Sequence, residues 1–468
     1  MISVSPPGVR RLRWRDAAAG LALAAGLATL LGAGRGAPPS ILVVTLDTVR
    51  ADHCSAYGYR RPTTPVLERL ARAGILFEEA YAPMATTAPA HASLFTGLAP
   101  AAHGVLRNGQ VLAAGHHTLA ERLAAAGYRT AAFVGSFAVD GRFGFAQGFD
   151  VFDDDLGTPG APEGRREWEG AAVAGAFDRD AAVTTASALA WLASRRGDRR
   201  PYLLWVHYYD PHAPYAPPPP YDGLFASDVD AGDATAAAIA RYDAEIRETD
   251  AALGRLLAGL RAAGRAASTV VVVASDHGEG LMDHGWMHHG VQLYEEAVRV
   301  PLVLRWPEGL PAGRRLRGPV QLADVMPTLL DLIGLPPEAA RPAGYEGASV
   351  AAAARGVAAL DAARPIHLRR RLYDASRVGG IPVAGETRAI RLGSWKYIEA
   401  PAEGTRELYD LARDPGERTN RLAEQPELAR RLAALVARRT EDEHAFAAAP
   451  VPVSAVDAVR LRALGYLP

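Results

Sequence analysis

The chain has 468 residues, 49% of them hydrophobic, which is enough to bury one large α/β domain with a smaller one appended, or two to three average domains. Its 51 basic and 52 acidic side chains give a formal net charge of −1, and no block of like charge interrupts the body of the chain. This balance argues against nucleic acid as a partner, because such binding needs a basic surface.

The first 37 residues have the pattern of an export segment. Four arginines between positions 10 and 15 precede an uncharged, alanine-rich run at residues 17–33, and two prolines follow. This order is typical of the basic and apolar regions of a signal peptide. The run is shorter than the roughly 20 apolar residues that span a bilayer, which favours a cleaved signal over a retained membrane anchor but leaves both open. We therefore predict that residues 1–37 are an export signal or N-terminal anchor and that the body is periplasmic or extracellular.

From residue 38 onward, apolar strands alternate with helices. We predict strands at residues 41–46, 130–134, 202–208, 269–274 and 301–306, and helices at residues 65–73, 88–95, 118–126, 180–193, 237–263 and 323–333. The strands are mostly continuous apolar runs, as in a parallel sheet that is buried on both faces. The alternation predicts an α/β fold with a doubly wound, largely parallel sheet and helices on both faces.

Four stretches interrupt this alternation. We interpret residues 143–170 as an irregular excursion and residues 311–319 and 342–364 as loop-like. Residues 217–220 are consecutive prolines, which predicts an extended segment without the hydrogen bonds of a sheet.

The pattern changes after about residue 364. Short antiparallel strands are predicted at residues 387–391, 395–399 and 406–408, and a closing helix at residues 427–438. We therefore predict a main domain at residues 38–363 and a small C-terminal α+β subdomain with a short antiparallel sheet at residues 364–468.

The segment at residues 86–97 is the most informative one, and it reads TTAPAHASLFTG. Asp47 follows the first predicted strand, and Asp276 and His277 follow the strand at residues 269–274. Active sites on such sheets lie beyond the carboxyl ends of the strands, so we expect these side chains to converge. Carboxylates and an imidazole suit a divalent cation: Mn, Zn, Mg or Ca. A hydroxyl beside such an ion is equipped to attack a sulfate or phosphate ester.

These motifs resemble the sulfatase family, within the alkaline-phosphatase superfamily. The family signature reads Cys/Ser-x-Pro-Ser-Arg-x-x-Leu-x-Thr-Gly, and the positions that fall on it are Thr87, Pro89, Ala90, His91, Leu94, Thr96 and Gly97. Further motifs occur in the family's order: SDHGE at residues 275–279, YEE at 294–296 with VP at 300–301, and LYDL at 408–411 with DP at 414–415. The resemblance extends from about residue 41 to the C-terminus. It implies a sulfatase-like catalytic domain at residues 38–363 and also leads us to expect the smaller subdomain.

The resemblance implies one divalent metal ion. It implies that the ligands of this ion are Asp47, Thr87, Asp276 and His277. In the two-carboxylate version of the family a second aspartate would follow Asp47, but Thr48 occupies that place here. The thinner ligand set disfavours Ca²⁺, which prefers many oxygens, and favours Mn²⁺ or Zn²⁺.

Thr87 stands at the signature's Cys/Ser position, and we predict that it is the nucleophile. An alcohol needs a base or a metal to become a good nucleophile, and the N-terminus of the predicted helix would direct free amides at an incoming anion. Family members that hydrolyse sulfate esters typically oxidise the Cys or Ser to formylglycine, and a secondary alcohol cannot become that aldehyde. The threonine therefore favours phosphorus over sulfur as the attacked atom, but both remain open.

Histidines take the places where the family has cationic side chains. His91 occupies the arginine position of the signature, and we expect it to hydrogen-bond the nucleophile or the anion. His212 and His289 fall where the resemblance expects oxyanion and leaving-group contacts, and a histidine can protonate a leaving oxygen. Both are therefore our general-acid candidates, with Arg50 as a further source of positive charge. We expect His207 to be a core residue.

The sequence thus predicts a sulfatase-like, metal-dependent hydrolase that cleaves a phosphate or sulfate ester of a small molecule, glycan or lipid. One alternative is a membrane-associated phospho-headgroup transferase, which the marginal N-terminal segment disfavours. Another is a sulfatase-like binding protein without turnover, which the joint presence of the four ligand candidates disfavours. The sequence leaves the oligomeric state open.

Overall fold

The computed structural model describes residues 37–157, 178–230, 232–335, 342–378 and 380–448, together with the backbone of two short paired strands, β5 (Glu167–Trp168) and β6 (Ala171–Ala172). The predicted export segment, up to residue 36, lies outside the described residues. Within the described part of the chain, no helix combines the length and apolarity that a membrane span requires. From Pro39 onward, the described residues belong to one compact unit. The boundary that we predicted at residue 364, between a main domain and a C-terminal subdomain, is not tested by this division and stays a prediction.

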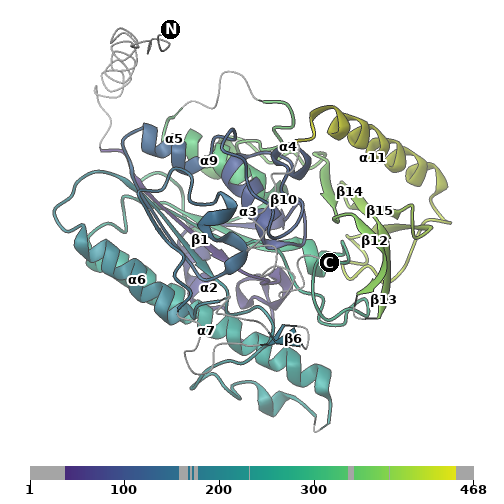
Figure 1. The fold of residues 1–468 in the computed structure, drawn as a ribbon, viewed down its shortest axis with the longest axis horizontal. Helices are drawn as coiled ribbons and strands as arrows, with labels where there is room; N and C mark the ends of the chain where they lie inside the picture. The colour runs from purple at the N-terminus through teal and green to yellow at the C-terminus, as the bar shows by residue number, and fades with distance from the viewer. Residues whose placement is uncertain are drawn as a thin grey trace, which may run out of the picture. The chain divides into compact units, whose positions relative to one another are not determined.

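An eight-stranded sheet forms the centre of this unit, with β1 near its middle (Figure 1). In chain order its strands are β1 (Ser40–Leu46), β2 (Ile75–Tyr81), β3 (Arg129–Val134), β4 (Val151–Asp153), β7 (Tyr202–Tyr208), β8 (Thr269–Ser275), β9 (Arg299–Arg305) and β10 (Arg314–Gln321). They lie in the order β10-β2-β9-β8-β1-β7-β3-β4. Strand β9 is antiparallel to β8 and β2, and the other neighbouring pairs in this sheet are parallel. The prediction of a largely parallel sheet is confirmed.

Helices cover both faces of the sheet, as predicted. One face packs against α2 (Pro65–Arg72), α6 (Ala181–Ser194) and α7 (Ala234–Ala262), and the other against α3 (Thr87–Thr96), α5 (Leu119–Ala125) and α9 (Val325–Leu332). Strand β1 shows why: Ile41 and Val43 belong to one hydrophobic cluster, while Leu42 and Val44 belong to the other. Side chains of a strand alternate between faces, so a continuous apolar run requires cover on both.

Two segments that we predicted as loop-like contain regular structure. Residues 314–321 form β10, an edge strand that pairs with β2 alone. An edge strand tolerates arginines and a proline. Because these residues interrupt the apolar pattern of β10, the sequence did not predict a strand there. The region 342–364 contains the short helix α10 (Ala351–Arg355).

The predicted irregular excursion at residues 143–170 is also partly regular. Its residues 151–153 form β4, which pairs in parallel with β3 at the opposite edge of the sheet from β10. Strand β2 was not predicted, because Glu78 and Glu79 interrupt its apolar run.

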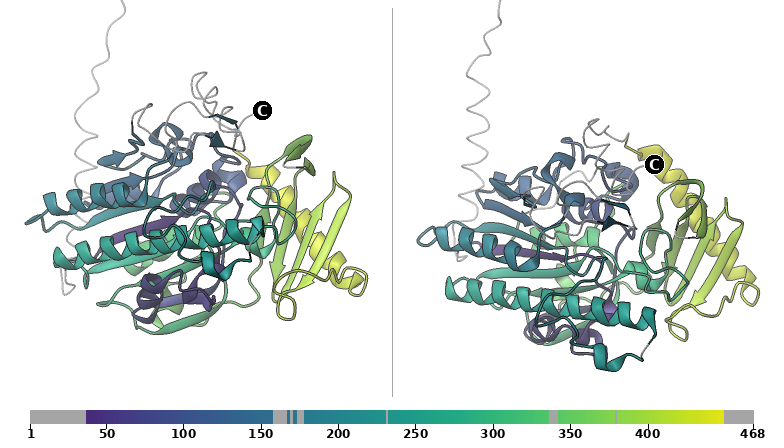
Figure 2. Two further views of the ribbon diagram at one scale, coloured as in Figure 1. Left: turned by 90° about the horizontal axis from the view of Figure 1, so that it is seen from below. Right: turned by 60° about the horizontal axis from the view of Figure 1, so that its bottom comes forward.

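The C-terminal part holds the predicted antiparallel sheet. Its four strands, in the order β11-β14-β15-β16, are β11 (Ile366–Arg369), β14 (Arg388–Leu392), β15 (Trp395–Ala400) and β16 (Thr405–Asp410). Helix α11 (Pro426–Phe446) lies along these strands in both views of Figure 2. A separate hairpin of β12 (Tyr373–Val378) and β13 (Ile381–Gly385) packs on the 286–291 loop through Tyr373, Val383 and their neighbours.

Candidate active site

The ends of two neighbouring strands bring Asp47 and Asp276 together. Strands β1 and β8 are parallel neighbours whose register pairs Leu46 with Ser275. The amide of Asp276 then donates to the Leu46 carbonyl at 3.1 Å, so the ladder continues one residue past the strands. Two residues that are 229 positions apart in the sequence therefore emerge side by side at the carboxyl edge of the sheet, as predicted.

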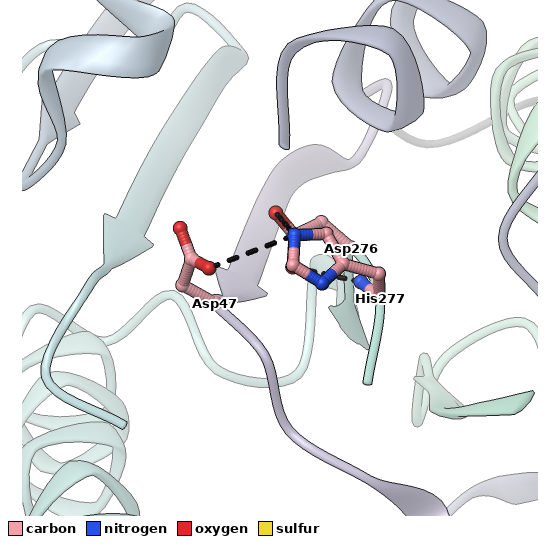
Figure 3. Close-up of side chains that lie close together, drawn as sticks. All are labelled: Asp47, Asp276 and His277. Atoms are coloured by element: carbon pink, nitrogen blue, oxygen red, sulfur yellow. Dashed lines mark hydrogen bonds and ion pairs between the residues drawn. The ribbon is translucent and has the colours of Figure 1, made fainter. Parts of the chain in front are cut away.

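Asp47, Asp276 and His277 form a compact cluster (Figure 3), in which one ligand atom from each lies within 4.8 Å of the others. The Nε2 atom of His277 is 3.9 Å from Asp47 Oδ1 and 3.6 Å from Asp276 Oδ2. All three side chains are fully buried. The spacing is that of groups sharing one coordination sphere rather than of unrelated polar residues.

The donor atoms of this cluster fit a divalent cation. Both carboxylate oxygens of Asp47 and Oδ2 of Asp276 have no hydrogen-bond partner among the described residues. Such buried acceptors are costly unless something satisfies them, and a cation would satisfy all three. The Nδ1 atom of His277 donates to the Gly278 carbonyl at 2.9 Å, which leaves Nε2 as the nitrogen for a metal.

The electrostatics of the carboxylates agree with this interpretation. Burial raises the pKa of Asp47 to about 7, although the nearby His277 acts in the opposite direction. Burial also raises the pKa of Asp276, and the Asp47 carboxylate beside it adds to the effect. Two buried carboxyl groups that share a site resist ionising together without a cation. Protons and metal ions therefore compete for these oxygens.

Thr87, the predicted nucleophile, lies at this cluster. It is the first residue of α3, is 1% exposed, and places its Oγ1 3.3 Å from His277 Nε2. The helix begins one residue earlier than predicted. The Ala88 amide, which we expected to face the anion, instead donates to Asn108 Oδ1 at 2.8 Å. Asn108 thus anchors the first turn behind Thr87.

His91 lies one helical turn after Thr87 and is fully buried. Its Nδ1 donates to the Thr87 backbone carbonyl at 2.8 Å, so the predicted hydrogen bond reaches the backbone rather than the hydroxyl. Nδ1 is also 3.7 Å from Asp276 Oδ2. Burial lowers the pKa of His91 to about 3, with His207 adding to the effect, so the ring is neutral and cannot replace an arginine's charge.

Of the two general-acid candidates, His289 lies beside the ligand cluster, and His212 contacts His289. The ring of His289 is 4.4 Å from that of His277 and 5.0 Å from that of His212. His289 Nδ1 is 3.2 Å from Oε1 of the buried Glu279, and Tyr215 donates to the other oxygen of Glu279 at 3.0 Å. Burial lowers the pKa of His289 to about 4, so it is neutral at pH 7 until an anionic group stabilises its charged form.

Thr48 and Arg50 do not extend the site. The Thr48 hydroxyl donates to the Pro211 carbonyl at 3.0 Å, and its backbone adopts a φ of 55°, which is unusual for a β-branched residue. The guanidinium of Arg50, which we expected to supply charge, pairs instead with Asp52 at 2.6 Å and Asp283 at 2.7 Å. The positive charge near the transferred group must come from elsewhere.

Sequence reasoning missed three residues of the site. Asn108 and Glu279 were given no role, although each makes a buried hydrogen bond to the machinery. His207 was predicted as a core residue; it is buried, but its Nε2 lies 3.4 Å from Asp47 Oδ2. The register of β1 and β7 indicates this position. His207 pairs with Thr45, which lies two residues before Asp47, so His207 and Asp47 are on the same face of the sheet.

Two protein-family models match this chain. The model described as "Sulfatase" matches residues 39–335, and the one described as "N-sulphoglucosamine sulphohydrolase, C-terminal" matches residues 282–443. The chain belongs to the sulfatase family. The resemblance drawn from the motifs is thereby confirmed, and the second match covers most of the C-terminal sheet and α11.

Individual members of the sulfatase family align over different lengths. Arylsulfatase K of Mus musculus is 35% identical over 190 residues, which are 40% of this chain and about a third (33%) of that protein. Choline-sulfatase of Rhizobium meliloti (strain 1021) is 28% identical over 445 residues, covering 83% of both chains. The solved phosphonate monoester hydrolase of Agrobacterium radiobacter shares the fold, with a TM-score of 0.69 and 24% identity over 86% of this chain and 96% of that chain.

Proposed function

We propose that this member of the sulfatase family is a metal-dependent hydrolase that cleaves a phosphate or sulfate ester, with Thr87 as the nucleophile. The observation that supports it best is the position of the Thr87 hydroxyl, 3.3 Å from Nε2 of His277, which forms a buried cluster with Asp47 and Asp276. An alcohol in such a place gains nucleophilicity from a bound cation. The substrate class is an ester of a small molecule, glycan or lipid, and the N-terminal pattern supports export to the periplasm or beyond.

Asp47, Asp276 and His277 would hold the cation, with Thr87 Oγ1 completing the set. When bound, the ion lowers the pKa of the Thr87 hydroxyl and neutralises charge on the transferred group. We propose Mn²⁺ or Zn²⁺, because Thr48 adds no carboxylate and its hydroxyl is engaged by Pro211.

The residues of the chain carry the bond changes. With a cation bound, Thr87 Oγ1 would give its proton to solvent before the substrate binds. The resulting alkoxide attacks phosphorus or sulfur and forms a covalent ester as the bond to the leaving oxygen breaks. His289 or His212 gives a proton to that oxygen, so that an alcohol leaves. A water molecule then attacks the Thr87 ester, and the same imidazole accepts its proton. Phosphate or sulfate is released, Thr87 Oγ1 leaves as the oxyanion that began the cycle, and the imidazole is again protonated.

The threonine favours phosphorus. A secondary alcohol cannot be oxidised to the aldehyde that family members use on sulfate esters, so the intermediate must be released by hydrolysis of the Thr87 ester itself. The names of similar proteins include both kinds of substrate. Arylsulfatase K and choline-sulfatase are named for sulfate esters, and phosphonate monoester hydrolase is named for a phosphorus compound.

The test is a paired assay of 4-nitrophenyl phosphate, phosphate diesters, phosphonates and sulfates, after chelation and with Mn²⁺, Zn²⁺, Mg²⁺ or Ca²⁺ added back. Thr87→Val keeps the shape of the side chain and removes its hydroxyl. We expect kcat to fall at least about 10³-fold in this variant while it still binds the cation. Mass spectrometry of the quenched wild type should find a phosphoryl or sulfuryl group on the peptide containing Thr87. Full turnover of every substrate by Thr87→Val would refute the proposal.

The same assay separates the two alternatives. A transferase would form a new ester when glycerol or another alcohol is added, in preference to free phosphate. A binding protein would hold the cation and the ester without turnover of any substrate in the series.

A further inference from the structure

The two oxygens of Asp47 face two different imidazoles. Oδ1 lies on the side of His277, at 3.9 Å from its Nε2, and Oδ2 lies 3.4 Å from Nε2 of His207. Figure 3 shows one Asp47 oxygen turned toward His277 and the other turned away from it. Neither oxygen has a hydrogen-bond partner among the described residues, nor does His207 Nε2. The cluster described above, whose ligand atoms all lie within 4.8 Å of one another, consists of Asp47, Asp276 and His277 and does not include His207, so the contact of His207 with Asp47 stands apart from it.

The ring of His207 is held as the ring of a metal-binding histidine is held. Its Nδ1 lies 3.0 Å from the hydroxyl of Thr45, which also accepts a hydrogen bond from Trp205 Nε1 at 2.9 Å. A threonine oxygen has two lone pairs, so it can accept from both rings. In the tautomer with its proton on Nδ1, the Thr45 oxygen accepts that proton and Nε2 presents its lone pair toward Asp47. His277 uses the same arrangement, with the Gly278 carbonyl as its acceptor.

The separation of the two atoms suits an ion between them. An N–H···O hydrogen bond normally spans about 2.7–3.2 Å, and 3.4 Å between His207 Nε2 and Asp47 Oδ2 is longer than that. Two ligands of a tetrahedral zinc ion with bonds of about 2.0–2.1 Å lie about 3.3 Å apart. The ring of His91, in a T-shaped contact 4.7 Å away, packs against His207 and restricts its movement.

We propose that His207 is a further metal ligand, on the Oδ2 side of Asp47, and that it gives the site a second imidazole and a preference for Zn²⁺ over Mg²⁺ and Ca²⁺. Mg²⁺ and Ca²⁺ bind mainly through oxygen, whereas imidazole suits zinc. The inference rests on the proposed metal-dependent function, and it identifies the residue that decides which ion that function uses.

Metal affinity tests it directly. Protein freed of metal is titrated with Zn²⁺ and with Mg²⁺ in competition with a chromophoric chelator, for the wild type, His207→Ala and His103→Ala. His103 is a matched control: it is equally buried, and its ring nitrogens contact Ser93 Oγ at 3.0 Å and the Val105 amide at 3.1 Å. We expect His207→Ala to raise the Kd for Zn²⁺ about 100-fold or more and to leave the Kd for Mg²⁺ nearly unchanged, with no such change in His103→Ala.

X-ray absorption at the zinc edge gives a second readout that does not depend on activity. It should count two imidazoles in the wild type and one in His207→Ala. Added free imidazole should restore part of the lost affinity by entering the space left by the ring. Circular dichroism, together with the milder variant His207→Asn, establishes that the variants are folded.

The outcomes separate this inference from the proposed function. Zinc affinity equal to the wild type in both His207 variants, with one imidazole at the metal, overturns the inference. If Asp276→Ala loses the ion in that same experiment, the proposed function still stands. A wild type that binds none of the ions overturns both.

Discussion

At the scale of single residues, neither the buried histidines His91 and His207 nor Arg50 brings free positive charge to the site. Burial lowers the pKa of His91 to about 3 and that of His207 to about 4, so both rings are neutral. Arg50 is paired with two aspartates, and the only lysine of the chain, Lys396, lies in the C-terminal sheet. A transferred dianion must therefore be met by the cation and by hydrogen bonds. We expect chelation to abolish turnover for this reason.

The role of His289 depends on the leaving group. A general acid matters most when the departing oxygen is basic, because a poor leaving group needs its proton in the transition state. We expect His289→Ala to lower kcat/KM about 10²–10⁴-fold for alkyl esters and much less for 4-nitrophenyl esters. His212→Ala should show the same selectivity if it is the acid instead. The measurement is a series of esters that differ in leaving-group pKa. An equal loss across the series would assign both histidines to binding rather than to proton transfer.

At the scale of elements, a buried ion cluster joins the C-terminal sheet to the rest of the unit. Lys396, on β15, is fully buried and pairs with Glu295 at 3.1 Å and Glu417 at 3.0 Å. Glu295 begins α8 (Glu295–Val298), which follows the loop that carries His289, and its amide donates to the second oxygen of Glu417 at 2.5 Å. The Lys396 ammonium is thus one of the contacts that hold this loop against the C-terminal part of the chain, together with the Arg370 bond to the Val291 carbonyl at 3.1 Å.

Removing that ammonium should destabilise the whole unit. Lys396→Met leaves the buried Glu417 and the partly buried Glu295 without their cation, and we expect the free energy of unfolding to fall by about 3–5 kcal/mol in urea titrations. The control is Arg430→Met, which removes an ion pair with Glu427 on the exposed face of α11 and should leave the unfolding free energy unchanged within error. Equal stability of the two variants would mean that Lys396 is replaceable by packing alone.

At the scale of the whole molecule, the buried carboxyl groups of Asp47 and Asp276 should couple folding to pH and to metal binding. The pKa of Asp47 is about 7 in the folded chain, against an ordinary value of 3.8. Between these values the unfolded chain has released its proton and the folded chain has not. The contribution of Asp47 to the free energy of unfolding therefore falls as the pH rises through this interval. A cation bound at Asp47 would take the place of the proton, and the free energy of unfolding would then no longer fall over this pH interval.

Thermal unfolding should show this coupling. We expect saturating Mn²⁺ to raise the Tm of the wild type more at about pH 8 than at about pH 5.5, because fewer protons oppose binding at the higher pH. In metal-free protein, the Tm of the wild type relative to Asp47→Asn should fall over the same interval. The buried histidines, whose lowered pKa values make stability rise with pH, affect the wild type and Asp47→Asn equally. Their contribution to the Tm therefore cancels in this comparison. A relative Tm that does not change with pH would contradict the shifted pKa of Asp47.

Much of the fold could be predicted because its signals are local. The apolar runs of β1, β7 and β8 and the caps of α2 and α5 depend on neighbouring residues, and the structure has these elements within a residue or two of the predicted limits. Strand β10 was missed because its arginines and proline are tolerated only at the edge of the sheet. Strand β2, which lies between β10 and β9, was missed because Glu78 and Glu79 interrupt its apolar run. Edge position is decided by distant pairing, which no local pattern contains.

The sequence by itself indicated the family, the type of sheet and three candidate metal ligands, Asp47, Asp276 and His277, because strand ends and the order of the motifs can be recognised along the chain. Only the tertiary structure decided what surrounds them: that Arg50 is paired elsewhere, that Asn108 takes the Ala88 amide, and that His207 faces Asp47. The physical reason is that these contacts depend on strand register and on burial. A shift of one residue in β7 would turn His207 to the other face of the sheet without changing any local propensity.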